Sequence, residues 1–249
     1  MIILVPYGGL INRMRVISAG YQYSKIKHEK LIVLWERNHE INCRFEILFQ
    51  KIPGLNIIQS SNLILWYKKI IFSILKNKTP FYKEVTRDNF SNKQYNKYYL
   101  NTCHQFFGNY NDLCMFKPHL VFIEEASKYI SENTIGVHIR RTDHIIAIEN
   151  SPLSQFERAI EKEIINDSNV KFYLSTDDIK VENELIEKFK ERIITRKKIF
   201  NRNNSEGIKD ALIDFIALSL SKRIYGSYLS SFGEFAAIYG KKQFIIIKK

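Results

Sequence analysis

Two adjacent arginines, Arg140 and Arg141, follow a short apolar stretch and are the residues best placed to do chemistry. They belong to the segment 136–143, written GVHIRRTD, whose apolar residues predict a buried strand. A guanidinium offers five donors in a planar fork that suits phosphate or carboxylate. Ligands of open α/β sheets bind outside the carboxyl ends of the strands. The segment therefore predicts a phosphate-bearing ligand at these arginines, with a surface pair salt-bridged to Asp143 as the alternative.

Two other predicted strand ends carry polar residues of a related kind. The segment 175–178 (STDD) follows a predicted strand, and the segment 226–233 (GSYLSSFG) precedes a predicted helix. A serine- and glycine-rich turn ahead of a helix favours an anion, although Ser, Thr or Asp can also simply cap a helix. At one edge of a parallel sheet, these groups would suit a nucleoside diphosphate. Arginines and serine N–H groups would meet the phosphates, and carboxylates would accept from the ribose or from a guanine edge.

The chain opens with a third turn of interest. An apolar strand over 2–5 leads into Gly8 and Gly9, and a helical period follows over 11–27. Backbone N–H groups at such a helix start favour an anion. The turn lacks the third glycine of a dinucleotide fingerprint and the lysine of a P-loop, so a plain tight turn is the alternative.

Composition limits the partners. The chain has 249 residues, of which 45% are hydrophobic and 26% charged, as in an ordinary globular protein. The net charge of +12 indicates an anionic partner, such as a phosphorylated substrate or a membrane surface. The lysines are scattered and the usual nucleic-acid motifs are absent, so we expect no nucleic-acid partner. The three cysteines form no CxxC pair, so we expect free thiols and no metal site.

We expect a cytoplasmic protein. The first six residues carry no basic region and no small-residue cleavage site, unlike a signal peptide. The longest apolar stretch, 63–75, is broken by Lys68 and Lys69 and is too short to span a bilayer. The basic surface leaves peripheral attachment to the inner face of the membrane as an open possibility.

Strands and helices alternate along the chain, which predicts an α/β fold with parallel sheets. We place strands at 2–5, 31–35, 55–58, 98–102, 134–140, 170–174, 193–194, 223–225 and 244–247. We place helices at 11–27, 43–49, 62–76, 119–131, 155–165, 181–191, 205–220 and 234–239, and a loop at 144–151. The helix at 119–131 is the candidate hinge between two halves, 1–130 and 131–249.

The polar segments also resemble a known family. The segment 136–143 resembles the first shared motif of the α-1,2/α-1,6/protein O-fucosyltransferase superfamily. The segment 172–178 (FYLSTDD) resembles the second motif, and 210–237 (DALIDFIALSLSKRIYGSYLSSFGEFAA) the third. The opening segment 8–13 (GGLINR) is similar to the glycine-rich N-terminal turn of the α-1,2 and O-fucosyl branches.

The resemblance implies a GT-B fold of two Rossmann-like halves, the first on the acceptor side and the second binding the nucleotide sugar. It implies inverting transfer of fucose from GDP-fucose without a metal or other cofactor. Arg140 would stabilise the leaving β-phosphate. His138 and Asp214 would contact the guanosine, and Asp143 would shape the pocket. The remaining substrate-binding positions carried over are Gly9, Asn12, Arg13, Arg141, Asp177, Asp178, Ser230, Ser231 and Phe232.

Inversion requires a base on the opposite face of the sugar. Glu149 lies near the place of a glutamate that follows the paired arginines in α-1,6-fucosyltransferases, and Asp143 is the other candidate. A structural role on a solvated loop is the alternative for Glu149. Gly233, Ile11 and Arg13 depart from the family pattern, which leaves the linkage and the donor sugar open. We expect a glycan acceptor, such as a bacterial surface polysaccharide or a lipid-linked oligosaccharide. The alternatives are another nucleotide-sugar donor and a non-catalytic nucleotide- or glycan-binding protein.

Overall fold

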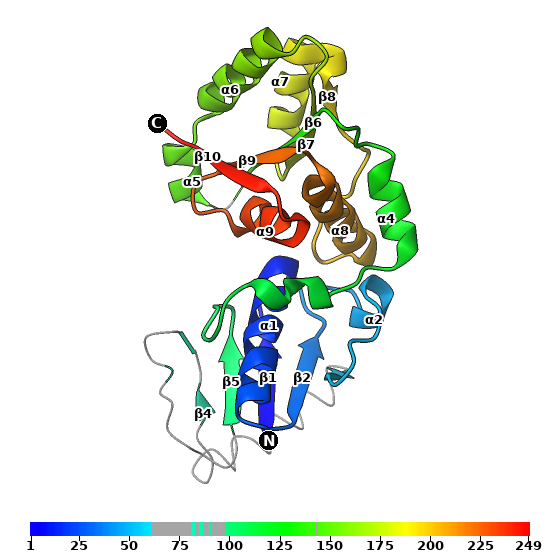
Figure 1. Cartoon of the computed structure of the whole chain (residues 1–249), viewed down its shortest axis with the longest axis vertical. Coiled ribbons are helices and arrows are strands. Elements are labelled where there is room, and N and C mark those ends of the chain that lie inside the picture. The colour runs from blue at the N-terminus through cyan, green and yellow to red at the C-terminus, as the bar shows by residue number, and fades with distance from the viewer. Residues whose placement is uncertain (61–80, 83–84, 87–89, 91–97, 143) are drawn as a thin grey trace. The chain divides into compact units, whose positions relative to one another are not determined.

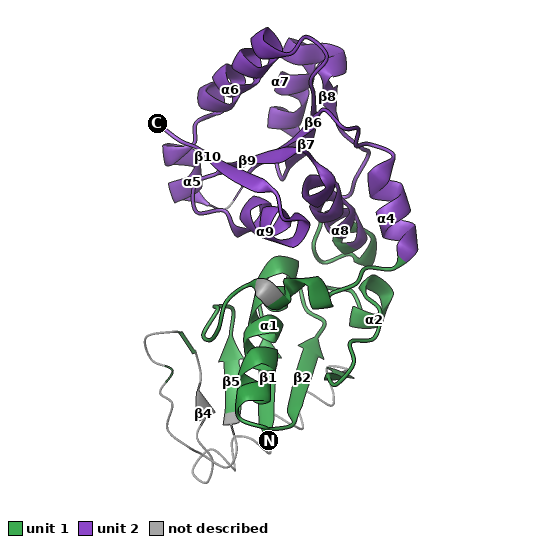
Figure 2. Cartoon of the chain, in the orientation of Figure 1, with its two compact units in different colours: residues 1–119, 201–208 green, residues 120–200, 209–249 purple. Residues whose placement is uncertain are grey.

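The computed structural model describes residues 1–60, 81–82, 85–86, 90, 98–142 and 144–249. The predicted helix at 62–76 and the candidate base Asp143 lie outside these residues. The chain divides into two compact units (Figure 2). Unit 1 is Met1–His119 with Asn201–Ile208, and unit 2 is Leu120–Phe200 with Lys209–Lys249. This division and the predicted boundary at 130 lie on opposite sides of helix α4, Leu120–Ser127.

Unit 1 is built on a parallel sheet in the order β3-β2-β1-β5-β4 (Figure 1). Its strands are β1 Ile2–Pro6, β2 Leu31–Glu36, β3 Asn56–Ser60, β4 Phe81–Tyr82 and β5 Tyr98–Thr102. Its described helices are α1 Leu10–Ile26, the short α2 Phe45–Leu48 and a 3-10 helix, Asn111–Met115. The central β1 is apolar because helix α1 packs closely on it. A Cβ atom at Gly20 would lie 2.6 Å from Leu4 Cδ2, so a larger residue at this position would require the Leu4 side chain to move.

Unit 2 contains the second parallel sheet, in the order β10-β9-β6-β7-β8. Its strands are β6 Thr134–Ile139, β7 Lys171–Thr176, β8 Ile193–Ile194, β9 Arg223–Ser227 and β10 Gln243–Ile247. The register pairs His138 of β6 with Ser175 of β7 on one side and with Gly226 of β9 on the other. The three segments that carry the predicted motifs are therefore neighbours in the sheet, as the sequence predicts.

Helices cover the sheet of unit 2 and bury its apolar side chains. They are α4, α5 Ile145–Asn150, α6 Leu153–Asn166, α7 Ile179–Phe189, α8 Ser205–Leu220 and α9 Ser231–Gly240, with a 3-10 turn at Lys190–Arg192. Phe156 and Ile160 of α6 and Leu185 of α7 are buried in one apolar cluster with side chains of β6 and β7. This packing holds the strand ends in fixed positions, so polar groups beyond them sit on a rigid base. In the part of the chain that the structure describes, no helix combines the length and the hydrophobicity that a membrane span requires.

The predicted loop at 144–151 is wrong, because most of it forms helix α5. The His144 ring begins the helix by accepting a hydrogen bond from the backbone N–H of Ala147, 3.1 Å away. A helix of six residues is too short to show a helical period, which is why the sequence pattern missed it. Glu149 therefore lies on an exposed helical turn rather than on a loop.

Candidate active site

Arg140 links three strand ends of unit 2. It follows β6 directly, and its guanidinium pairs with Asp177 Oδ2, 2.7 Å away, just after β7. Its backbone N–H donates to the hydroxyl of Ser227, the last residue of β9, over 3.1 Å. The Arg140 side chain is 16% exposed, so it is held in place and still reaches the surface. The structure thus brings together the strand ends that the sequence assigned to one site.

Asp177 fixes the turn that carries Arg140. Besides the ion pair, its carboxylate accepts from the backbone N–H of Arg141 over 2.8 Å and from the hydroxyl of Thr142 over 2.7 Å. Burial alone would raise the pKa of Asp177, but the charge of Arg140 and these hydrogen bonds outweigh it and lower the pKa. The carboxylate is therefore an anion at neutral pH and orients the guanidinium.

Asp178 has a different environment from its neighbour. Its side chain accepts from the backbone N–H of Lys180 over 2.8 Å and caps helix α7. The capping bond explains the position of the Asp178 carboxylate, whereas the Asp177 carboxylate faces Arg140. A substrate contact of Asp178 stays a prediction.

Arg141 points into the protein. One end of its fork donates to the carbonyl of Arg140 and the other to the carbonyl of Ser151, each over 2.9 Å. The Ser151 hydroxyl in turn accepts from the backbone N–H of Tyr228, over 2.8 Å. Burial lowers the pKa of Arg141, yet a guanidinium stays charged at neutral pH. Arg141 thereby ties the turn after β6 to the turn after β9, and no pattern in the sequence indicates this role of Ser151.

His138 is buried beside the start of helix α9. Its ring stacks on Phe232 with centroids 5.0 Å apart, and its Nδ1 lies 3.4 Å from the Ser230 hydroxyl. Burial, and then the charge of Arg140, lower the pKa of His138 to about 4, so the imidazole is neutral at pH 7. Gly233 packs closely on this histidine, since an added Cβ atom would lie 3.1 Å from the His138 Cβ and would require a small shift. The departure from the family pattern at Gly233 therefore belongs to the packing of this histidine.

The turn before α9 presents backbone donors at the same edge of the sheet. Ser230 is the N-cap residue of α9 and makes no side-chain capping bond, and Ser231 is half-buried. The first N–H groups of a helix have no partner within the helix and favour an anion. Leu229 holds a φ of 53°, an unfavourable conformation for a side chain of this size. The turn thus keeps a strained backbone where Ser230, Ser231 and Phe232 gather.

Asp214 is fully engaged inside the protein. Its Oδ1 accepts from the Tyr173 hydroxyl over 2.7 Å and from Arg196 Nε over 3.1 Å. Its Oδ2 accepts from the Ser175 hydroxyl over 3.0 Å and from Lys198 Nζ over 3.1 Å. Four donors fill the lone pairs of a carboxylate. A guanosine contact of Asp214 therefore stays a prediction, and it would require one of these donors to leave.

Sequence reasoning missed Arg196 and Lys198 because the segment between β8 and α8 has no periodic pattern. Arg196 also pairs with Asp210, 2.6 Å away, and Lys198 with Glu182, 3.3 Å away. Burial would raise the pKa of Asp214, but the two cations outweigh it and lower the pKa. Through Asp210 and Asp214 the cluster holds the middle of α8 against β7 and the segment that follows β8.

In unit 1, a side chain of the protein itself binds at the glycine turn. Gly8 has a φ of 85°, which favours glycine, and its backbone N–H donates to Glu40 Oε2 over 2.8 Å. Gly9 is the N-cap residue of α1, and Asn12 is half-buried in its first turn. An internal carboxylate thus sits where the turn would meet an anion. Substrate contacts of Gly9 and Asn12 stay predictions.

Arg13 is fully buried, and its guanidinium donates its hydrogen bonds to other groups of the protein. Its Nε donates to the Gly8 carbonyl and one terminal nitrogen to Asn38 Oδ1, each over 3.0 Å. The other nitrogen donates to the Glu36 carbonyl, and the guanidinium lies 5.0 Å from the centroid of the Trp35 ring. Burial lowers the pKa of Arg13 to about 10. A substrate role for Arg13 stays a prediction, and its contacts show a structural one.

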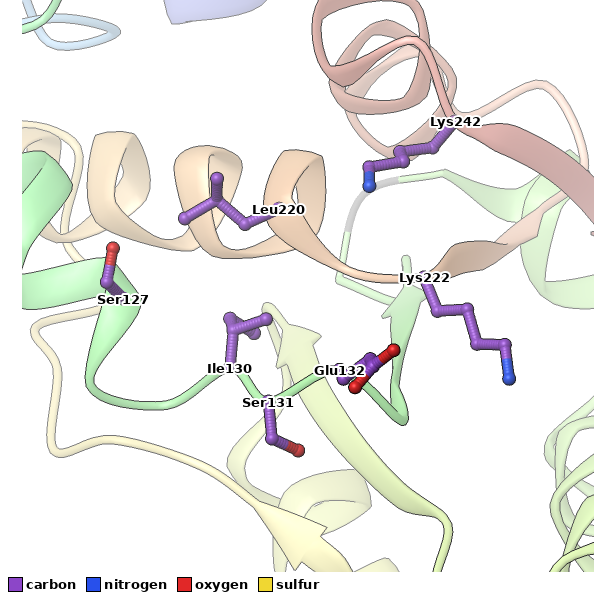
Figure 3. A pocket seen from close by; sticks show the side chains of 7 residues that line it. All are labelled: Ser127, Ile130, Ser131, Glu132, Leu220, Lys222 and Lys242. Atoms are coloured by element: carbon purple, nitrogen blue, oxygen red, sulfur yellow. The ribbon is translucent and has the colours of Figure 1, made fainter.

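No metal cluster is formed by the described residues, since no three His, Cys, Asp or Glu side chains gather to hold an ion. A pocket of about 470 Å³ lies at the other end of the sheet of unit 2 (Figure 3). It is lined by Ser127, Ile130, Ser131, Glu132, Leu220, Lys222 and Lys242. Lys222 and Lys242 immediately precede β9 and β10, so this pocket opens at the amino ends of the strands, away from Arg140.

Comparisons with known proteins give a clear result for the fold. No family model and no curated protein sequence matches this chain. Among solved structures, NodZ alpha-1,6-fucosyltransferase soaked with GDP-fucose is 16% identical, with a TM-score of 0.67 over 96% of this chain and 92% of that one. POFUT1 in complex with GDP is 11% identical, with a TM-score of 0.58 over 99% and 98%.

A plant protein extends the same likeness. FUT1 from Arabidopsis thaliana, in complex with GDP, is 13% identical, with a TM-score of 0.63 over 98% of this chain and 69% of that one. At such identities the likeness establishes the fold alone. The chain has the two-sheet α/β fold of these fucosyltransferases, which confirms the GT-B-like architecture that the sequence predicts.

Proposed function

We propose that this protein is a glycosyltransferase that moves fucose from GDP-fucose to a glycan acceptor. The observation that carries the proposal is the guanidinium of Arg140, held by Asp177 at the carboxyl edge of the unit 2 sheet. Proteins of the same fold have been crystallised with GDP or GDP-fucose. The three sequence motifs of that superfamily converge on the same edge of the sheet.

The chemistry follows from the charge that develops on the leaving group. When the bond from the sugar to the diphosphate breaks, negative charge grows on the β-phosphate. A fixed guanidinium stabilises that charge without having to reorganise, because Asp177 already sets its direction. The N–H groups at the start of α9 point to the same edge and would hold the diphosphate. In this proposal no metal ion is needed at the phosphates.

The acceptor side of the reaction requires a base and a surface that binds the acceptor. Inversion would use Glu149, on the exposed turn of α5, or Asp143 as the base that takes the proton of the acceptor hydroxyl. Unit 1 would bind the acceptor. The acceptor class proposed is a bacterial surface polysaccharide or a lipid-linked oligosaccharide.

A different nucleotide-sugar donor is the second candidate, and one observation favours it. The four internal donors on Asp214 leave it no free lone pair for the N–H groups of a guanine edge. A nucleobase with a different pattern of hydrogen-bond donors would then be bound by other groups of the pocket.

Calorimetry with GDP, UDP and ADP separates these candidates. The proposal expects GDP to bind at least tenfold more tightly than the others, and EDTA to leave the affinity unchanged. Release of GDP from GDP-fucose in the presence of a lipid-linked oligosaccharide fraction then tests transfer. Absence of GDP binding would rule out the proposal. Binding without release on any acceptor would indicate a non-catalytic protein.

A further inference from the structure

Helix α5 exposes an unusual amount of apolar side chain for a six-residue helix. Ile145, Ile146 and Ile148 are 71%, 51% and 38% exposed, while Ala147 is buried beneath them. Single exposed apolar residues are ordinary on a protein surface, but neighbouring ones form a patch that usually binds something. The position of α5 in the chain, between Arg140 and Ser151, places the patch beside the candidate site.

Two other segments meet the end of α5. The hydroxyl of Ser151, directly after the helix, accepts from the backbone N–H of Tyr228 over 2.8 Å. The next residue, Leu229, is 60% exposed in its strained conformation. The backbone N–H of Lys249 donates to the carbonyl of Asn150, the last residue of α5, over 3.0 Å.

These contacts define one surface, which we call the α5 surface. It consists of Ile145, Ile146, Ile148, Leu229, Lys248 and Lys249, and Glu149 of α5 is the exposed carboxylate beside them. Figure 1 shows α5 beside the end of β10, as the bond from Lys249 requires. The strained conformation of Leu229 is informative, because it keeps an exposed apolar side chain where a polar residue or glycine would cost less.

We propose that the α5 surface binds the protein to an anionic lipid bilayer. Transfer of isoleucine and leucine side chains from water into the acyl boundary is favourable, and adjacent lysines bind anionic headgroups. The net charge of +12 attracts the whole chain to such a membrane. A second copy of this chain would suit the surface poorly, because it would bring two strongly basic molecules together with their lysines side by side.

The surface lies at the carboxyl edge of the unit 2 sheet, the edge that holds Arg140. Docking there would bring the candidate site to the membrane, where a lipid-linked acceptor would be presented to it. The membrane contact itself rests on the exposure of the α5 surface and on the positive charge of that surface and of the chain. It therefore stands or falls independently of the proposed reaction.

Co-sedimentation with vesicles tests the proposal directly. We expect the full chain to sediment with vesicles that contain phosphatidylglycerol and to stay in solution with phosphatidylcholine alone. The double variant Ile145→Ser/Ile146→Ser should lose at least about tenfold in partitioning, because two apolar side chains no longer enter the lipid. Ile165→Ser is the matched control, since Ile165 is 84% exposed on α6 and should not matter.

The lysines provide an independent test of the same surface. Lys248→Gln/Lys249→Gln should weaken partitioning by roughly fivefold for each lysine, and added salt should have the same effect. Lys241→Gln/Lys242→Gln, at the amino end of β10, is the control and should change it less. Ile145→Trp should shift its fluorescence to the blue with anionic vesicles, while Ile165→Trp should not.

Three results would overturn the proposal. The first is equal partitioning to both kinds of vesicle. The second is an equal loss in the α5 variants and in their controls. The third is a stable dimer in solution that Ile145→Ser/Ile146→Ser converts to a monomer, which would assign the α5 surface to a second copy of the chain. The tryptophan variants retain an apolar side chain, so they give an answer even if the serine variants fail to fold.

Discussion

Each unit has an arginine beyond the carboxyl end of its central strand, and the two are used in opposite ways. Arg13 in unit 1 is fully buried, and its contacts are the carbonyls of Gly8 and Glu36 and the amide of Asn38. Arg140 in unit 2 is partly exposed, and its guanidinium is oriented by the carboxylate of Asp177. The residue type and the position in the fold are alike, while the surroundings differ.

The difference shows what turns an arginine into a candidate for catalysis. Neutral carbonyls satisfy the donors of Arg13 and hold its turn together, and the carboxylate of Glu40 accepts from Gly8 where an anion would bind. Arg140 has a partner that sets its direction and a surface through which a ligand can reach it. These contacts give Arg13 a structural role, whereas phosphate binding by Arg140 stays a prediction that variants of the two arginines test.

The largest expected effect is that of Arg140→Ala. Loss of a charge aimed at the leaving group should reduce the rate of transfer by about 10²–10³-fold. The affinity for GDP should fall at least tenfold, because a charge-assisted hydrogen bond is lost. Calorimetry and a GDP-release assay measure both effects. Arg158→Ala, on the exposed side of α6, is the control. Full transfer by Arg140→Ala would end the proposed role of this residue.

Arg13→Met should act on stability instead. It removes the Arg13 donors from the Gly8 and Glu36 carbonyls and leaves the Asn38 amide oxygen with its two backbone donors alone, which should lower the free energy of unfolding by about 3 kcal/mol. Urea unfolding measures this loss. At a temperature where the variant is folded, its affinity for GDP should equal that of the original chain. A large loss of GDP affinity with unchanged stability would reverse the comparison between Arg13 and Arg140.

The pH dependence of stability should report on His138. Its pKa is about 4 in the folded chain and near 6.5 when unfolded, so the unfolded state binds more protons between these values. The contribution of His138 to the free energy of unfolding is therefore fully present above pH 6.5 and is lost as the pH drops towards 4. We expect a loss of about 2 kcal/mol between pH 7 and pH 5.

Substitution of the histidine separates this effect from other titrations. In His138→Gln the slope between pH 5 and pH 7 should largely disappear, whereas His39→Gln, at an exposed position of unit 1, should keep it. Urea unfolding at a series of pH values measures both variants. A slope that survives in His138→Gln would show that another group is responsible.

Much of the architecture could be predicted from the sequence because it depends on local patterns. Apolar runs identify the parallel strands, and the rule that ligands bind at their carboxyl ends brought the segments after β6, β7 and β9 to one edge. The register of His138 with Ser175 and Gly226 agrees with that prediction. Periodicity failed at α5, where six residues are too few to show it.

The hydrogen bonds and ion pairs of the site residues were harder to predict, because the partners lie far apart in the sequence. Nothing near Asp214 indicates that Arg196 and Lys198 will occupy its carboxylate. Nothing near Gly8 indicates that Glu40, 32 residues away, will take its N–H group. Residue types identify what a side chain can do, whereas only the tertiary contacts show whether its donors and acceptors are already used.

The smallest expected effect separates two adjacent carboxylates. Asp178→Ala removes the cap of α7, which should cost about 1 kcal/mol of stability and leave GDP affinity unchanged. Asp177→Asn should instead weaken GDP binding, because the neutral amide no longer fixes the guanidinium of Arg140. Thermal unfolding and calorimetry on both variants test the pair. Since the two residues are neighbours in sequence, equal effects on binding would mean that the whole turn, rather than the ion pair with Arg140, determines affinity.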